Sequence, residues 1–82
     1  MKNEFYWRVK AVKPQDNYIL YLTFADGKQA LFDMKPYLDC GVFKSLKDRQ
    51  VFDSVRVCAS SIAWENNVDI APETLYEEAI SI

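Results

Sequence analysis

A chain of 82 residues is long enough for one domain and too short for two, so we predict a single domain over residues 1–82. Half of the residues are hydrophobic and 15% are aromatic, which excludes a disordered chain. The net charge of −2 argues against non-specific coating of DNA, and the absence of histidine removes Cys–His zinc sites and His-activated nucleophiles.

Charge is unevenly distributed along the chain. Residues 1–50 carry nine Lys or Arg and six Asp or Glu, a net +3, whereas residues 51–82 carry one Arg and six acidic residues, a net −5. This polarity is typical of a solvated surface, and it could also steer the approach of a partner.

The sequence shows no export or membrane signal. The first ten residues have no apolar core of a secretory signal, and no apolar run approaches the ~20 residues of a membrane span. Cys40 and Cys58 form no CxxC pair, and a secreted scaffold of this size usually has more cysteines. We therefore predict a cytoplasmic protein with two reduced, partly buried thiols.

The first part of the chain predicts three antiparallel strands. Residues 6–14 alternate aromatic residues and Val with Arg and Lys, and Pro14 is expected to end this strand. A polar turn leads to a second strand at 18–24. Asp26-Gly27 then signals a hairpin into residues 28–34.

The length of the hairpin loop decides which side chains share a face. A two-residue loop would place Gln29 and Asp33 on the face of Leu22. A three-residue loop with a left-handed Gly27 gives one apolar face instead: Leu20, Leu22, Phe24, Ala30 and Phe32. We predict the three-residue loop. The opposite face then carries Ile19, Tyr21 and Leu31 beside Thr23, Gln29 and Asp33, and is too apolar to be fully solvated.

The remaining elements are short. Pro36 suits the start of a helix and Gly41 its stop, and residues 55–59 and 61–66 predict two strands. A last helix begins at Pro72, with Leu75, Tyr76 and Ala79 as its buried stripe. The sequence thus predicts an α+β fold: a small antiparallel sheet of about five strands, short helices in the middle and one C-terminal helix.

The acidic residues before and within this helix have a structural explanation. Glu73 lies in the first turn, where the helix dipole favours negative charge, and Asp69 could accept backbone N–H bonds just before it. Asp69 with Glu65 or Glu73 is also the one carboxylate pair suited to acid/base work or Mg²⁺ binding. We predict no enzyme, metal or cofactor, and keep an acid/base enzyme using Asp69 and Glu73 as an alternative.

Two surfaces are candidates for binding a partner. The first is the second hairpin face, with Ile19, Tyr21 and Leu31 joined by Tyr6 from the first strand; a protein partner or a second copy could dock there. The simpler interpretation is that a helix or the first strand covers this face. The second candidate consists of Trp64, Asp69 and Tyr76.

A nucleic-acid-associated regulator is the remaining alternative. Tyr6, Arg8 and Lys10 share one face of the first strand, and basic residues interleaved with aromatics can bind single-stranded nucleic acid. Trp7, on the other face, is expected in the core.

From Arg8 to Glu78 the chain resembles a bacterial family known as "domain of unknown function twenty-four forty-two". The resemblance rests on the F-x-D-G hairpin, the segment "FDMKPYL" and a W…D…P-E-x-L-Y ending, here Trp64, Asp69, Pro72, Glu73, Leu75 and Tyr76. Family members often carry Pro-x-Gly after the Trp, where this chain has Glu65 and Asn67. Because Asn tolerates a left-handed backbone, we expect the turn to survive.

The resemblance implies a compact α+β protein without assigned catalytic residues. Some relatives are fused to a helix-turn-helix DNA-binding domain, which this sequence lacks, and others are products of genes paired with another small protein. We predict a non-enzymatic binding module that acts through a protein partner, and the paired genes of the relatives imply that it is the antitoxin-like or regulatory member of a two-gene module.

Overall fold

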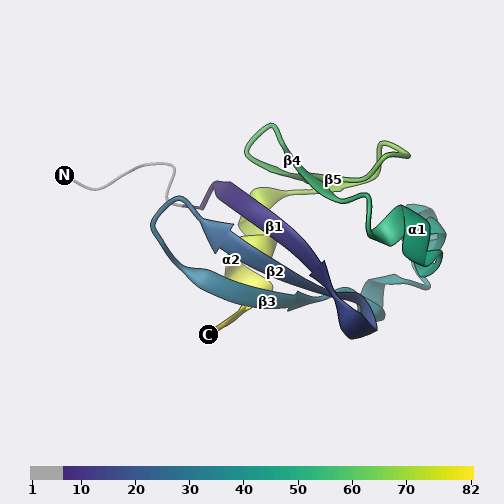
Figure 1. The fold of residues 1–82 in the computed structure, drawn as a ribbon, viewed down its shortest axis with the longest axis horizontal. Coiled ribbons are helices and arrows are strands. Elements are labelled where there is room, and N and C mark those ends of the chain that lie inside the picture. The colour runs from purple at the N-terminus through teal and green to yellow at the C-terminus, as the bar shows by residue number, and fades with distance from the viewer. Residues whose placement is uncertain (1–6) are drawn as a thin grey trace.

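The structure, a computed structural model, describes residues 7–82 (Figure 1). Its elements in chain order are β1 (Val9–Gln15), η1 (Asp16–Tyr18), β2 (Ile19–Phe24), β3 (Gln29–Asp33), η2 (Lys35–Tyr37), η3 (Gly41–Lys47), α1 (Arg49–Phe52), β4 (Arg56–Cys58), β5 (Ser61–Ala63), β6 (Asp69–Ile70), α2 (Pro72–Glu78) and β7 (Ile80–Ser81), where η denotes a short 3₁₀ helix.

The strands form two antiparallel sheets, which confirms the predicted α+β class. One sheet has four strands in the order β1-β2-β3-β7, and the other has three in the order β4-β5-β6. The two strands beyond the predicted five are β6 and β7, each two residues long. Segments this short show no alternation of polar and apolar residues, so the sequence does not reveal them.

The hairpin between β2 and β3 has the predicted register. Leu20 pairs with Phe32 and Leu22 with Ala30. The three-residue loop closes with a hydrogen bond from the Phe24 N–H to the Lys28 carbonyl, 2.8 Å long, and Gly27 is left-handed with φ of 91°. The Asp26 carboxylate accepts a 2.9 Å bond from the Lys28 N–H, which holds the turn in place.

A second loop, after Trp64, repeats this geometry. The Trp64 N–H donates to the Val68 carbonyl at 2.9 Å, and the Asn66 side-chain oxygen accepts from the Val68 N–H at 3.3 Å. Asn67 has φ of 67° and takes the place that Gly27 has in the first loop. The turn therefore survives with Asn, as predicted.

The first strand differs from its prediction. It begins at Val9 and runs through Pro14 to Gln15. Pro14 is tolerated because β1 is an edge strand of its sheet. The pairing shifts between Val9 and Ala11, so that Lys10 is the extra residue of a β-bulge.

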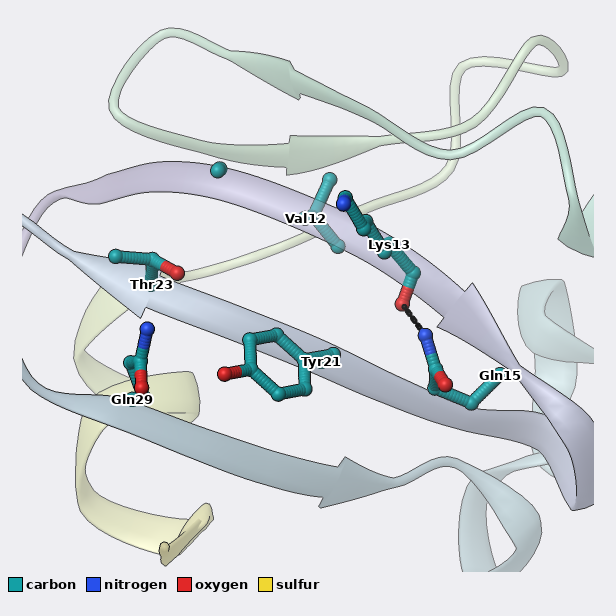
Figure 2. Close-up of a pocket in the computed structure, with 7 residues that line it drawn as sticks. Val12, Lys13, Gln15, Tyr21, Thr23 and Gln29 are labelled. Carbon is teal, nitrogen blue, oxygen red and sulfur yellow. Dashed lines mark hydrogen bonds between the residues drawn. The ribbon is translucent and has the colours of Figure 1, made fainter.

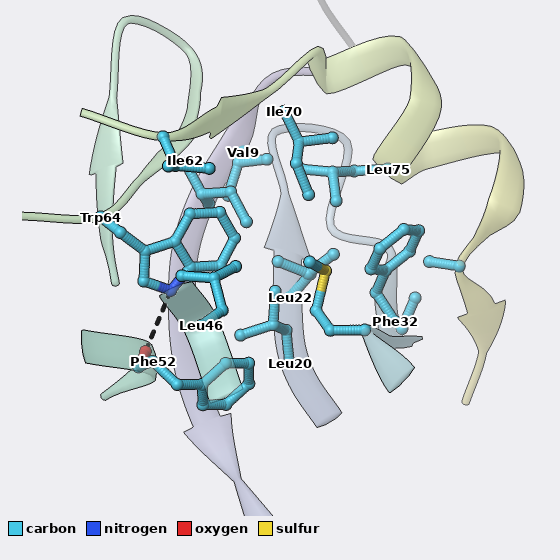
Figure 3. Close-up of a cluster of buried hydrophobic side chains, with 14 of the residues drawn as sticks. Val9, Leu20, Leu22, Phe32, Leu46, Phe52, Ile62, Trp64, Ile70 and Leu75 are labelled. Carbon is cyan, nitrogen blue, oxygen red and sulfur yellow. Dashed lines mark hydrogen bonds between the residues drawn. The ribbon is translucent and has the colours of Figure 1, made fainter. Parts of the chain in front are cut away.

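One core lies on a single side of the four-stranded sheet (Figure 3). The predicted apolar face is 0–2% exposed, and α2 and the second sheet pack against it through Leu75 and Ile62. Trp64 is fully buried, and its indole N–H donates a 3.0 Å hydrogen bond to the Phe52 carbonyl.

Expectations about four single residues were wrong. Trp7 is half-exposed instead of lying in the core, and both Cys40 and Cys58 are exposed free thiols instead of partly buried ones. Gly41 has the left-handed φ of a stop residue, 43°, but η3 begins at it. Aromatic and thiol side chains are often buried, but a domain this small buries a smaller share of its surface, and Trp7, Cys40 and Cys58 lie outside the core.

The left-handed backbone at position 67 predicts an order of stability. Replacing Asn67 by Ala should lower the free energy of unfolding by about 1 kcal/mol, because Ala tolerates positive φ poorly. Asn67→Gly should have a free energy of unfolding within about 0.5 kcal/mol of that of the natural chain. Gly adopts positive φ without steric strain, but it loses more conformational entropy on folding, and the two effects largely cancel. Urea unfolding of both variants, with Glu65→Ala as the loop control, measures this order. An Ala variant as stable as the Gly variant would contradict it.

Candidate functional site

The second face of the four-stranded sheet is open in residues 7–82. In Figure 1 this face is bare, with α2 behind the sheet. The first strand does not cover it either, because β1 lies beside β2 within the sheet. Ile19 and Tyr21 are half-buried by their neighbours and Leu31 is 38% exposed. The interpretation that a helix or the first strand covers this face is therefore wrong for the described part of the chain.

Cross-strand pairing arranges this surface in rows. The central row crosses all four strands, from Lys13 to Tyr21, Leu31 and Ile80. Because side chains alternate between the faces of a strand, the rows two residues away on either side point the same way as the central row. We call this surface the open face, and it consists of Ala11, Lys13, Gln15, Ile19, Tyr21, Thr23, Gln29, Leu31, Asp33 and Ile80.

The first of two hollows on the open face lies on the β1 side of Tyr21. Figure 2 shows Tyr21 lying along the sheet, with Lys13 and Gln15 on one side and Thr23 and Gln29 on the other. This hollow has a volume of about 410 Å³. Its lining is Ala11, Val12, Lys13, Gln15, Tyr21, Thr23 and Gln29.

The second hollow, of about 480 Å³, lies on the β7 side of the sheet. Its lining is more apolar and consists of Ile19, Leu31, Phe32, Asp33, Pro36, Tyr37, Glu78 and Ile80. Ile80, at its margin, is 73% exposed. Tyr21 lines the first hollow and Leu31 the second, and the two residues pair across β2 and β3.

The two hollows are lined by side chains of opposite charge. Lys13 lines the first, whereas Asp33 and Glu78 line the second. Lys35 partly offsets the Asp33 charge through a salt bridge of 3.1 Å. Glu78 accepts a hydrogen bond from the Tyr37 hydroxyl, and this bond is the main reason that the pKa of Tyr37 is raised.

The residues of the second predicted site each have structural partners of their own. Trp64 is buried beside Phe52, and Asp69 pairs with Ala63 in the β5–β6 ladder. The predicted capping role of Asp69 is also wrong, because Ala71 is the cap residue of α2 and that end of the helix has no side-chain cap.

Tyr76, the third member of that predicted site, joins α2 to the β2–β3 loop. Its hydroxyl donates a 2.7 Å hydrogen bond to the Asp26 carboxylate, and its ring packs edge-on against Phe24 with centroids 4.9 Å apart. The Lys28 ammonium lies 4.1 Å from the ring centroid and donates to the Tyr76 carbonyl at 3.2 Å. The Tyr76 hydrogen bond, aided by the Lys28 N–H, lowers the pKa of Asp26.

The residues of the two alternative functions are exposed. Arg8 and Lys10 lie at the start of β1, where the Arg8 carbonyl accepts a 2.8 Å bond from the Ala25 N–H. Tyr6, their predicted partner, lies outside the described residues. A hollow of about 340 Å³ beside β5 and β6 is lined by Asp69 but not by Glu73.

Sequence analysis missed several residues of the open face. Lys13 and Gln15 join it because the bulge at Lys10 reverses the alternation of β1. Ile80 joins it because β7 returns beside β3 after α2. A sequence signal for Ile80 exists only in its apolar character next to the helix end.

The fold and open face define a small α+β protein with a one-sided sheet. The chain belongs to the family described as "Protein of unknown function (DUF2442)", which matches residues 9–81 and confirms the resemblance. No functionally described protein and no solved structure gives a significant match. Within residues 7–82, no helix is both long and apolar enough to cross a membrane.

The Tyr76–Asp26 bond predicts a pH-dependent contribution to stability. Because Asp26 is exposed, water screens the bond, and Tyr76→Phe should lower the free energy of unfolding at pH 7 by about 0.5–1 kcal/mol. The pKa of Asp26 is lower in the folded chain, so this contribution is complete above the unfolded pKa of ~3.9 and is lost as pH falls through the folded pKa.

Urea unfolding between about pH 2 and pH 7 measures this effect. The difference in free energy of unfolding between the natural chain and Tyr76→Phe should vanish at low pH. When both proteins also carry Asp26→Asn, that difference should depend little on pH. A gap of constant size over the whole range would contradict the prediction.

Proposed function

We propose that this protein is a non-enzymatic binding module whose open face docks on a protein partner. The observation that carries the proposal is the row Tyr21, Leu31 and Ile80 on a sheet face that no element of residues 7–82 covers. The outer face of a half-solvated antiparallel sheet is usually polar, because alternate residues face water. Here apolar and aromatic side chains dominate its centre, as they do at the centre of a protein interface.

The mechanism of such a module is occupancy of the partner's surface. Tyr21 and Leu31 supply the apolar anchor, and the charges at the two hollows set the orientation of the complex. A cytoplasmic location is proposed from the two free cysteines. The resemblance adds that the partner is the product of a neighbouring gene, with this chain as the antitoxin-like or regulatory member. That part of the proposal rests on the resemblance alone.

Capture from the native host tests the proposal. Tagged natural chain should recover one protein in stoichiometric amount, or untagged copies of itself. Tyr21→Thr or Leu31→Thr should weaken that capture at least about tenfold, which corresponds to about 1.4 kcal/mol. Val57→Thr is a matched control, because Val57 is a 41% exposed strand residue on the other sheet, close to the 38% of Leu31.

The result also separates this proposal from the nucleic-acid alternative. Binding to nucleic acid should fall steeply with salt and should depend on exposed Arg8 and Lys10, at the start of the first strand, and not on Tyr21. Capture that survives both open-face variants, or that is lost only with Arg8→Ala and Lys10→Ala, would overturn the proposal of a protein partner at the open face.

A further inference from the structure

We propose that residues 71–82, which comprise α2 and β7, form a strap that opens as one unit while residues 9–70 stay folded. Three side chains, Asp26, Lys28 and Tyr76, form the latch that sets how often this strap opens. The strap is a property of the single chain and does not depend on what binds the open face.

The strap contributes little to the core. Of residues 71–82, only Leu75 and Ala79 are buried, and Figure 3 shows the Leu75 side chain reaching from α2 into the buried cluster. All other members of that cluster precede the strap. The chain just before the strap is anchored separately, because the Ser61 hydroxyl donates a hydrogen bond to the Ile70 carbonyl. Opening therefore withdraws two side chains from the core and leaves the other members together.

The helix of the strap has little stability of its own. α2 is seven residues long, and an isolated helix of this length is not stable in water. Its first turn has no side-chain cap. Glu77 and Glu78 lie in its last turn, where the helix dipole disfavours negative charge and where the helix has no basic residue to offset them. Contacts with the rest of the chain therefore hold α2 in its helical form.

The β2–β3 loop holds α2 through both the backbone and the side chain of Tyr76. The Lys28 ammonium donates to the Tyr76 carbonyl at 3.2 Å, at the end of the helix where carbonyls lack helical partners, and lies 4.1 Å from the ring centroid. The Tyr76 hydroxyl donates to Asp26 at 2.7 Å, and the Lys28 N–H donates to the same carboxylate. Loop and helix are thus joined by one connected set of polar contacts.

The ties at the other end of the strap are exposed. Glu78 accepts a hydrogen bond from the Tyr37 hydroxyl, and the Ile82 N–H donates to the Gln29 carbonyl at 3.0 Å. β7 is a two-residue edge strand whose Ile80 is 73% exposed. Because water competes for exposed hydrogen bonds, each tie stabilises the strap only modestly. These features place the strap among the segments that open before the whole domain unfolds.

Opening of the strap changes both faces of the four-stranded sheet. When β7 leaves, β3 becomes an edge strand with free backbone groups, and the part of the apolar hairpin face that α2 covers becomes accessible. Ile80 leaves the central row of the open face in the same step. The latch therefore controls how much apolar surface the sheet presents on each side.

Hydrogen exchange of the purified chain, followed by NMR in urea below the unfolding midpoint, tests whether the strap opens separately. The N–H groups of Ala79 and Ile82, which donate to the Leu75 and Gln29 carbonyls, report its opening. Both should exchange at least about tenfold faster than the slowest amides of β2. Their exchange should also depend less on urea, because opening exposes less surface than unfolding does. Equal rates or an equal urea dependence would overturn separate opening.

Tyr76→Phe and Lys28→Met test the latch. Each removes an exposed polar contact, so each should speed exchange at Ala79 and Ile82 by about two- to fivefold. The slowest β2 amides should speed up by the same factor, because the contact is lost in the opened and in the unfolded chain alike. Strap amides that exchange at the natural rate in both variants would overturn the role of the latch.

Two matched controls lie outside the strap. Tyr18→Phe removes a hydroxyl that donates to the Lys47 carbonyl, and Lys47→Met removes an exposed ion pair of 2.6 Å with Asp39. Both contacts persist while the strap is open, so both variants should leave the strap amides within about 1.5-fold of their natural rates. A control that speeds the strap amides as much as the β2 amides would show that the strap opens only with the whole chain. Circular dichroism verifies that each variant is folded.

Discussion

The wholly apolar face of the β2–β3 hairpin is the constraint on which the rest of the structure depends. Leu20, Leu22 and Phe24 face the core from one strand, and Ala30 and Phe32 from the other, all 0–2% exposed. A face of this kind is stable only when another layer covers it. The chain after the hairpin supplies this covering layer: Ile62, Trp64 and Leu75 belong to the same buried cluster as the hairpin face.

Covering one face of the sheet leaves the other open within the described residues 7–82. A chain of 82 residues buries a smaller share of its surface than a larger protein does, and its two later layers, α2 and the second sheet, both pack on the same side. The central row of the open face is nevertheless apolar at Tyr21, Leu31 and Ile80. No other element of residues 7–82 covers this apolar row, and exposed apolar surfaces of this kind commonly mark sites of protein recognition.

Local rules fixed the parts of the fold that the sequence predicts well. Asp26-Gly27 set the loop and hence the register of the hairpin, Asn67 could replace a glycine, and Pro72 started the last helix. The candidate site was predicted in part, because Ile19, Tyr21 and Leu31 follow from that same register. Each of these features depends on the conformational preference of one or two residues, which a sequence carries directly.

The sequence by itself therefore determined the hairpin, its two faces and the start of the last helix, because alternation and turn chemistry act between near neighbours. Only the tertiary structure decided which face would be covered, that Lys13 and Ile80 would share a row with Tyr21, and that Trp7, Cys40 and Cys58 would lie outside the core. Those outcomes depend on where distant segments pack, on a bulge at Lys10 and on a two-residue strand after α2, and none of these is encoded in a local pattern.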